Sequence, residues 1–275
     1  MRAQRKSAGP TRLFVLLTDF GLSDWYVGVM KGVLTARAPG VPIVDLTHEI
    51  SPGDVRAAAF VLENSWTWFA EGSIFLVVVD PGVGTARRAI AVRAGDRFFV
   101  GPDNGVLSPV LETSQARVHL IDTVALGVES VSNTFHGRDI FAPAAALLAE
   151  PGAFDRLGTE IDDAERIDRG HLVLSHNRIA GHVVYVDRFG NCITDISESA
   201  LSDFRGSTPP SSLVVRTGEV VIRGVVSNYV EADAEPCALI GSSGRLEIAV
   251  GRGDASTHLG LEAGDVVEIS LNETD

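Results

Sequence analysis

The first half of the chain alternates apolar runs of strand length with segments whose apolar residues recur every three or four positions. Residues 13–18 and 74–79 are apolar runs typical of strands covered on both faces, and residues 43–46 form a shorter strand. Between them, residues 26–34 and 55–69 carry amphipathic stripes that predict helices. Strands that alternate with helices at this spacing predict an α/β fold, with a mostly parallel sheet and helices on both of its faces.

The pattern changes in the last third of the chain. From about His171, short alternating strands are separated by glycine-containing turns without a convincing helical stripe, which predicts a smaller C-terminal antiparallel β-barrel. We therefore expect an N-terminal α/β domain over residues 1–170 and a barrel domain over residues 171–275. The basic, polar residues 1–12 are expected to be disordered. Within the first domain, Gly95-Asp96 predicts the turn of a hairpin.

Composition narrows the choice of partners. The chain has 275 residues and a formal charge of −13, which argues against nucleic acid as the main partner because phosphates require a basic surface. No apolar run is long enough to cross a membrane, so no membrane partner is expected. Cys192 and Cys237 lie in no metal-type spacing and make no disulfide framework, which favours a reducing cytoplasm.

Polar residues gather where the predicted parallel strands end, which is where open α/β sheets bind ligands. Asp19, Asp80 and the pair Asp45 with His48 occupy such positions. Each has a simpler interpretation: Asp45, like Asp54, serves equally well as a helix cap, and a buried structural role is the more frequent one for His48. Chemistry alone also permits a metal-dependent hydrolase that uses Asp19, Asp80, Asp103 and His136.

Six ordered blocks carry a resemblance to a known family. They are LLTDFG (16–21), VVVDPGVGT (77–85), GPDNGVL (101–107), TFHGRDIFAP (134–143), VDRFGNCITDI (186–196) and GSSGRLEIA (241–249). Together they resemble the S-adenosyl-L-methionine (SAM) hydrolases that form adenosine, also called SAM hydroxide adenosyltransferases, to which SAM-dependent fluorinases and chlorinases are related. The resemblance implies an N-terminal α/β domain, a C-terminal β-barrel, and a homotrimer that holds SAM at subunit interfaces.

The resemblance also implies roles for individual residues. It assigns an Asp-Arg-His triad around a water to Asp80, Arg87 and His136, although the adjacent Arg88 leaves open which arginine points inward. It assigns the ribose hydroxyls to Asp19. It assigns the methionine end of the substrate to Asp187, Phe189, Asn191 and Ser242, with Ser243 standing where the halogenases carry an arginine.

The implied reaction converts SAM and water to adenosine and L-methionine. The sulfonium leaves as a neutral thioether, so neither a metal nor another cofactor is expected. Asp80 and His136 are expected to accept hydrogen bonds from the attacking water, while Arg87 favours its hydroxide-like form. The alternatives are a halogenase, disfavoured because a halide pocket should not present a carboxylate, a non-catalytic SAM or adenosine sensor, and the metal-dependent hydrolase.

Overall fold

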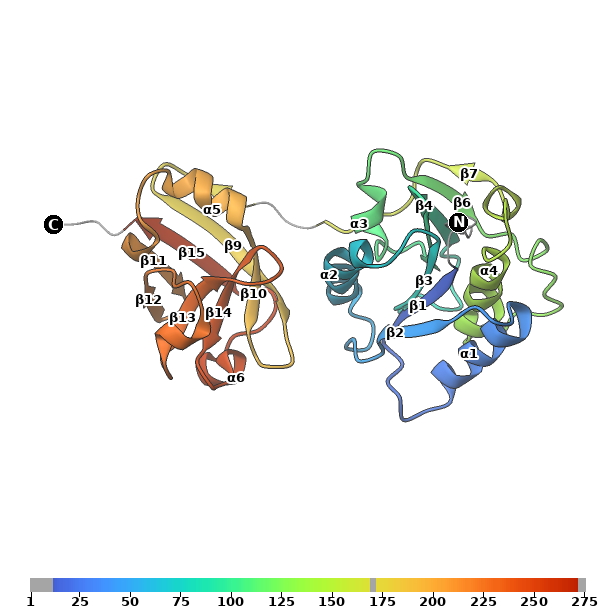
Figure 1. The fold of residues 1–275 in the computed structure, drawn as a ribbon, viewed down its shortest axis with the longest axis horizontal. Coiled ribbons are helices and arrows are strands. Elements are labelled where there is room, and N and C mark those ends of the chain that lie inside the picture. The colour runs from blue at the N-terminus through green and yellow to red at the C-terminus, as the bar shows by residue number, and fades with distance from the viewer. Residues whose placement is uncertain (1–11, 169–171, 272–275) are drawn as a thin grey trace, which may run out of the picture. The chain divides into compact units, whose positions relative to one another are not determined.

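A computed structural model describes residues 12–168 and 172–271. The chain separates into two compact units, Met1–Asp168 and Arg169–Asp275, which are described separately below (Figure 1). The expected boundary at residue 170 and, apart from Arg12, the expected disordered arm lie outside the described residues. No helix in the described part of the chain is long and apolar enough to span a membrane.

The first unit is built on one seven-stranded sheet. Its strands lie in the order β2 (Ile43–Thr47), β1 (Leu13–Thr18), β3 (Ser73–Val78), β5 (Arg97–Pro102), β4 (Ala89–Ala94), β6 (Arg117–Leu120) and β7 (Glu160–Ile161). The first four are mutually parallel, whereas β4, β6 and β7 each join by antiparallel pairing. The sheet is therefore mixed, because β4 and β5 form the hairpin predicted at Gly95-Asp96 and so reverse the chain direction.

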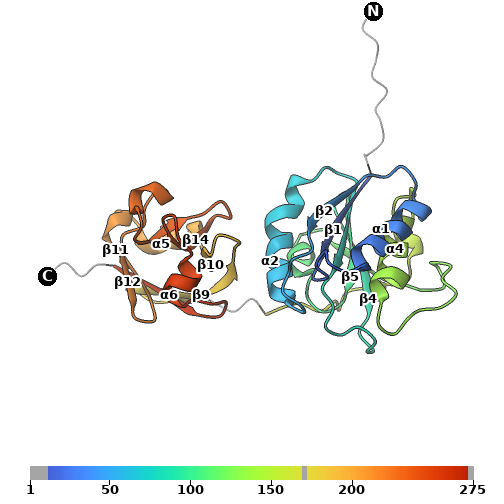
Figure 2. The same ribbon diagram turned by 90° about the horizontal axis from the view of Figure 1, so that it is seen from below.

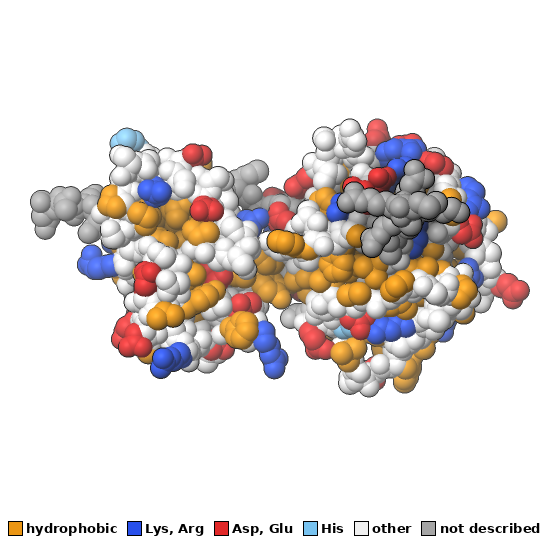
Figure 3. Space-filling view, viewed as in Figure 1, with side chains coloured by type: hydrophobic (Ala, Val, Ile, Leu, Met, Phe, Trp, Pro, Cys, Tyr) orange, Lys and Arg blue, Asp and Glu red, His pale blue; other side chains and the backbone are white. Residues whose placement is uncertain are grey.

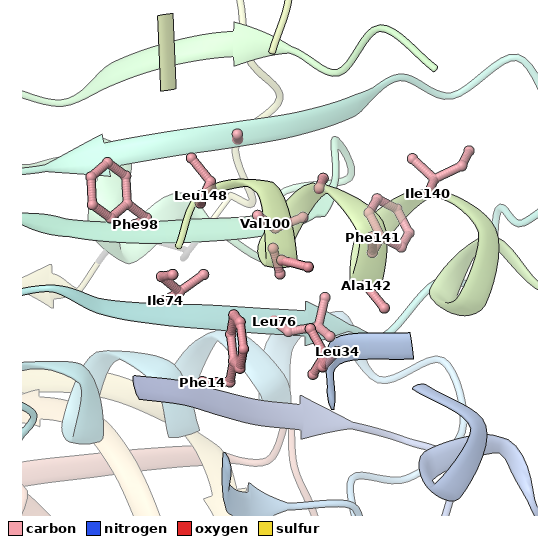
Figure 4. Close-up of a cluster of buried hydrophobic side chains, with 14 of the residues drawn as sticks. Phe14, Leu34, Ile74, Leu76, Phe98, Val100, Ile140, Phe141, Ala142 and Leu148 are labelled. Carbon is pink, nitrogen blue, oxygen red and sulfur yellow. The ribbon is translucent and has the colours of Figure 1, made fainter. Parts of the chain in front are cut away.

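Helices cover both faces of this sheet, as predicted. Figure 2 shows α2 (Val55–Ser65) on one face and α1 (Tyr26–Arg37) with α4 (Ala142–Leu147) on the other. On the second of these faces Phe14, Leu34 and Leu76 are fully buried in one apolar cluster (Figure 4). The remaining short helices of the unit are η1 (Trp66–Trp68), α3 (Ser108–Leu111), the π-helical turn η2 (Gly137–Phe141) and η3 (Phe154–Arg156).

Local capping explains where α2 begins. The Asp54 carboxylate accepts a hydrogen bond from Ala57 N at 2.9 Å, which satisfies one of the free backbone donors in the first turn. The simpler interpretation of Asp54 as a cap is therefore confirmed. Asp45 caps no helix, because it lies within β2 and pairs with side chains instead.

The second unit is an antiparallel barrel-like sheet, as predicted. Its strands run in the order β12 (Val220–Arg223), β11 (Leu213–Thr217), β15 (Val266–Leu271), β9 (Arg178–Val186), β10 (Cys192–Ser197), β14 (Arg245–Val250) and β13 (Pro236–Ile240), with β8 (Val173–Leu174) paired to β9. A bridge from Val226 to Leu239 brings the two ends of the sheet together. Alternate residues fill an apolar interior that includes Val215, Ile248 and Ile269.

Within residues 172–271 the barrel also contains four short helices, which were not predicted. They are α5 (Glu198–Arg205), η4 (Pro210–Ser212), η5 (Tyr229–Ala232) and α6 (Ala255–Leu259). Elements this short leave no periodic signal, and α5 buries only Leu201. On the face seen in Figure 3, acidic and basic side chains are interspersed over both units, with no single-sign patch.

Candidate active site

Strand order explains why the candidate residues of the first unit meet. β1 and β3 are parallel neighbours in continuous register, so the loops that follow them leave the same edge of the sheet. Asp19 follows β1 and Asp80 follows β3. Both carboxylates line a cavity of about 290 Å³, whose walls also include Phe20, Tyr26, Thr134 and His136.

Asp80 and Arg87 form a buried, two-pronged ion pair. Arg87 Nε donates to Asp80 Oδ1 at 2.8 Å, and Arg87 Nη2 donates to Asp80 Oδ2. The side chains are only 5% and 9% exposed, so the pair is shielded from bulk water. The guanidinium carbon also lies 5.0 Å from the centre of the Phe141 ring. These contacts give Arg87 a single, well-determined orientation.

His136 completes the cluster. Its Nδ1 lies 2.6 Å from Arg87 Nη2, and because a guanidinium can only donate, Nδ1 must accept. Burial and the positive charge of Arg87 lower the pKa of His136, although Asp80 and Asp139 act in the opposite direction. His136 is therefore neutral at neutral pH, and its remaining proton sits on Nε2.

The two adjacent arginines have separate partners. Arg88 Nε donates to Asp103 Oδ2 at 2.7 Å, and Arg88 Nη1 donates to Asp163 Oδ1 at 2.7 Å. Asp103, whose side chain is 1% exposed, also accepts from the Glu165 amide at 2.8 Å. Arg87 is thus the arginine that contacts Asp80. Arg88 and Asp103 instead form hydrogen bonds with the segment that follows β7. Asp103 does not line the cavity.

Asp19 lines the cavity, and one of its carboxylate oxygens accepts a hydrogen bond from the backbone. Its Oδ2 accepts from the Gly53 amide at 2.8 Å. Burial raises the pKa of Asp19, the Gly53 hydrogen bond opposes this, and the nearby charge of Asp80 adds to the rise. Two carboxylates therefore share one small cavity, an arrangement that suits a cationic ligand.

His48 is a buried structural residue, as its simpler interpretation predicted. Its Nδ1 lies 2.8 Å from Thr18 Oγ1, its Nε2 lies 3.1 Å from Asp45 Oδ1, and its side chain is 1% exposed. Asp45 in turn accepts from Lys31 Nζ at 2.6 Å. None of these side chains reaches the cavity lining.

The candidate residues of the second unit lie in two tight turns. In the turn between β9 and β10, Asp187 Oδ1 accepts from the Phe189 and Asn191 amides at 2.8 and 2.9 Å, and Asp187 Oδ2 accepts from Asn191 Nδ2 at 3.0 Å. Phe189 is 75% exposed at the tip. In the turn between β13 and β14, Ser242 is exposed, while Ser243 Oγ is buried without a hydrogen-bond partner among the described residues.

Several residues around these sites were missed from the sequence. Phe20 and Thr134 lie inside two of the family blocks, so their proximity to Asp19 and His136 was the available signal. In the barrel, Glu247 is 4% exposed and accepts from the Tyr229 hydroxyl at 2.6 Å. Glu247 lies inside the last family block, but Tyr229 lies in none and comes from a separate element, so the pair itself could not be predicted.

The described residues contain no group of three or more His, Cys, Asp or Glu side chains arranged to hold a metal ion. In particular, Asp103 is paired with Arg88, and Asp80 is paired with Arg87. Of the four residues named for a metal-dependent hydrolase, Asp19, Asp80 and His136 line one cavity, whereas Asp103 lies outside it.

The fold and the cavity are those of an α/β enzyme with a C-terminal barrel, and comparison with known proteins identifies its family. The model of the SAM hydroxide adenosyltransferase N-terminal domain matches residues 14–158, and that of the C-terminal domain matches residues 181–268. The chain belongs to the SAM hydroxide adenosyltransferase family.

Individual relatives are similar over nearly the whole chain. The (R)-S-adenosyl-L-methionine hydrolase of Thermus thermophilus is 41% identical over 92% of this chain and 97% of its own length. The enzyme of the same name from Salinispora tropica is 37% identical over 95% and 98%. A fluorinase of Nocardia brasiliensis is more distant, at 27% identity over 70% of this chain and 74% of its own.

Two solved structures are similar in fold over nearly the whole chain. A conserved protein of Thermotoga maritima has a TM-score of 0.87 and 38% identity, covering 94% of this chain and all of its own. A conserved protein of Thermus thermophilus has a TM-score of 0.74 and 38% identity, covering 94% and 99%.

Proposed function

We propose that this protein hydrolyses SAM to adenosine and L-methionine by in-line attack of a water molecule on the ribose C5′ carbon. The observation that carries the proposal is the hydrogen-bonded cluster of Asp80, Arg87 and His136, two of whose members line the cavity with Asp19. Membership of the family, and relatives named as hydrolases at 37% and 41% identity, support it.

The chemistry of the substrate explains why such a small set of groups suffices. The sulfonium departs as a neutral thioether, so the leaving group needs neither protonation nor a metal. The requirement is a water held in line behind C5′, and positioning of this kind can supply up to roughly 7–11 kcal/mol of the barrier. We therefore propose that no cofactor takes part.

Within the cluster, we assign the proton acceptor to Asp80. Arg87 occupies one lone pair on each Asp80 oxygen, which leaves the others able to accept from water. His136, with its proton on Nε2, donates to the water oxygen. A water that donates to Asp80 and accepts from His136 still has a lone pair for C5′. The role of His136 thus becomes donation, where the sequence suggested acceptance.

Asp19 is assigned to the ribose. A carboxylate can accept from both ribose hydroxyls, and each charge-assisted hydrogen bond contributes about 1.5–3 kcal/mol. The second Asp19 oxygen bonds the Gly53 amide, which determines the direction in which the carboxylate faces. Together with Asp80, Asp19 also favours a cationic substrate.

The methionine end is assigned to the second unit, and we propose a homotrimer that holds SAM at its subunit interfaces. Phe189 is 75% exposed beside Asp187 and Asn191, as expected of a residue that is covered on assembly. Ser242 and Ser243 are proposed contacts for the methionine carboxylate. Ser243 Oγ, buried and unpartnered within the described residues, has hydrogen-bonding capacity to spare.

We also propose a cytoplasmic location. Cys192 and Cys237 are both buried free thiols, which is the usual state of cysteines in a reducing compartment.

The decisive experiment incubates the purified protein with SAM in high chloride and separates the products by chromatography. We expect adenosine and methionine without 5′-chloro-5′-deoxyadenosine. A halide would lie against the free lone pairs of the Asp80 carboxylate, which repel an anion, whereas a water can donate to them. The chlorinated nucleoside would instead indicate a halogenase. Binding of SAM without turnover would indicate a sensor.

A separate assay with EDTA tests the metal-dependent hydrolase. Activity that is abolished by EDTA and restored by a divalent ion would indicate that enzyme.

A further inference from the structure

We propose that His48 is a positioning residue that holds Asp19 in place through the hydroxyl of Thr18, with Asp45 and Lys31 anchoring its far side. The proposal rests on the proposed role of Asp19 in binding the ribose. His48, Thr18, Asp45 and Lys31 themselves take no part in the proposed chemistry, and they act on it only through Asp19.

His48 and Thr18 hold the backbone on both sides of Asp19, in addition to the pairing of β1 with β3. The Thr18 hydroxyl lies 2.8 Å from His48 Nδ1 and accepts from the Phe20 amide at 3.2 Å. The Gly21 amide donates to the carbonyl oxygen of His48 at 2.7 Å. Residues on both sides of Asp19 are thus tied to one imidazole-bearing residue, and Thr18 itself is fully buried.

The other ring nitrogen of His48, Nε2, lies next to a pair of charged side chains. His48 Nε2 lies 3.1 Å from Asp45 Oδ1, and Asp45 Oδ2 accepts from Lys31 Nζ at 2.6 Å. Partial burial acts to raise the pKa of Asp45, but hydrogen bonds from Lys31 and His48 outweigh it and lower that pKa. The carboxylate therefore stays ionised close to Nε2, and the hydrogen bond to Thr18 orients the ring through Nδ1.

An irregularity in the pairing of β1 with β2 explains the direction of the His48 side chain. The register between β1 and β2 shifts after the pair Leu16–Asp45, so that Leu17 lies opposite Thr47. Such a bulge places one extra residue in β2 and turns the following side chains relative to the sheet. His48 follows directly and points back at the end of β1, while Lys31 reaches Asp45 from α1. His48 therefore contacts the residue before Asp19 directly, whereas Lys31 of α1 contacts only Asp45.

A double-mutant cycle tests the proposal. Thr18→Val removes the hydroxyl with little change in shape, and we expect it to raise KM for SAM about 10- to 100-fold with a smaller change in kcat. Thr18→Ser restores the hydroxyl and should restore KM. In an Asp19→Ala background, Thr18→Val should cause no further rise in KM, because the carboxylate that Thr18 positions is already absent. An unchanged KM in Thr18→Val, or additive effects in the cycle, would overturn the proposal.

A second variant and a control separate positioning from stability. His48→Asn keeps an acceptor near the position of Nδ1 and should affect KM less than His48→Ala. Thr217→Val removes another buried hydroxyl, one without a partner among the described residues, and should leave KM unchanged. Equal KM for His48→Asn, His48→Ala and the native protein would contradict the proposal.

Hydrogen exchange tests positioning without any reference to turnover. The Gly53 amide donates to Asp19, so its protection reports where that carboxylate lies. We expect faster exchange at Gly53 in Thr18→Val than in Thr217→Val. If the native protein released no adenosine, the proposed function would fail, yet this exchange difference would still support the positioning role. Unchanged exchange at Gly53 would reject that role alone.

Discussion

At the scale of single residues, two neighbouring arginines show how strongly side-chain direction decides chemistry. Arg87 bonds Asp80 and His136, whereas Arg88 turns to Asp103 and Asp163. The two residues share a side chain, a charge and a loop. Only one of them contacts a side chain that lines the cavity, so they form a natural matched pair for substitution.

Substitution by lysine should separate the two. Lysine keeps the charge but cannot make the two-pronged contact with Asp80 while also reaching His136. We therefore expect Arg87→Lys to reduce kcat by about 10²-fold, the scale of a lost positioned electrostatic group, and Arg88→Lys to leave kcat within about twofold. Steady-state SAM hydrolysis measures both. A larger kcat loss in Arg88→Lys would show that the wrong arginine was assigned.

The protonation state of His136 predicts a pH dependence. Because burial and Arg87 lower the pKa of His136 below its ordinary value near 6.5, the neutral ring persists somewhat below that pH. Its contribution to stability is complete above pH 6.5 and is lost as the pH falls through the lowered pKa. The acid limb of kcat should lie in the same range. Profiles of kcat and of thermal midpoint from about pH 4.5 to 8 should show both, and His136→Gln should flatten the histidine contribution.

At the scale of elements, the site depends on the close approach of two loops. Gly84, in the loop after β3, has φ +79°, and a Cβ there would overlap the carbonyl oxygen of Asn133 in the loop before η2. These loops carry Asp80 and His136 respectively. A glycine at position 84 therefore permits the spacing at which Arg87 bridges the two residues.

Two alanine variants, Gly84→Ala and Gly95→Ala, separate the effect of loop spacing on activity from the effect of backbone strain. Both glycines have positive φ, so alanine costs about 1–2 kcal/mol of stability at either position. Only at Gly84 does the new methyl group also push a loop away, since nothing lies within 4 Å at Gly95. We expect Gly84→Ala to lose at least about tenfold in kcat and Gly95→Ala to retain native kcat. Equal kcat in the two variants would mean that loop spacing is unimportant.

At the scale of the whole molecule, the proposed trimer makes two measurable predictions. Light scattering should give three times the 29.2 kDa mass of one chain. If each site draws residues from two subunits, mixing inactive Asp80→Asn with Asp187→Ala protein should restore part of the activity through mixed trimers. A fully active monomer would contradict the assembly, and a trimer without complementation would place each site within one subunit.

The sequence alone determined the alternation of strands and helices at the start of the chain, the antiparallel character of the second unit and the hairpin at Gly95-Asp96. These features follow from apolar periodicity and turn chemistry, which are local. It also placed Asp19 and Asp80 at the ends of parallel strands, from which a shared edge follows.

Only the tertiary structure decided how those ends meet. The contact between Arg87 and His136 spans 49 positions, and that between Arg88 and Asp163 spans 75. The antiparallel half of the sheet likewise depends on pairing between β4 and β6, which periodicity does not specify. Periodicity shows which face of an element is apolar, whereas the direction of a loop side chain depends on the neighbours that packing brings to it. The choice between Arg87 and Arg88, the tautomer of His136 and the partners of His48 are all of this second kind.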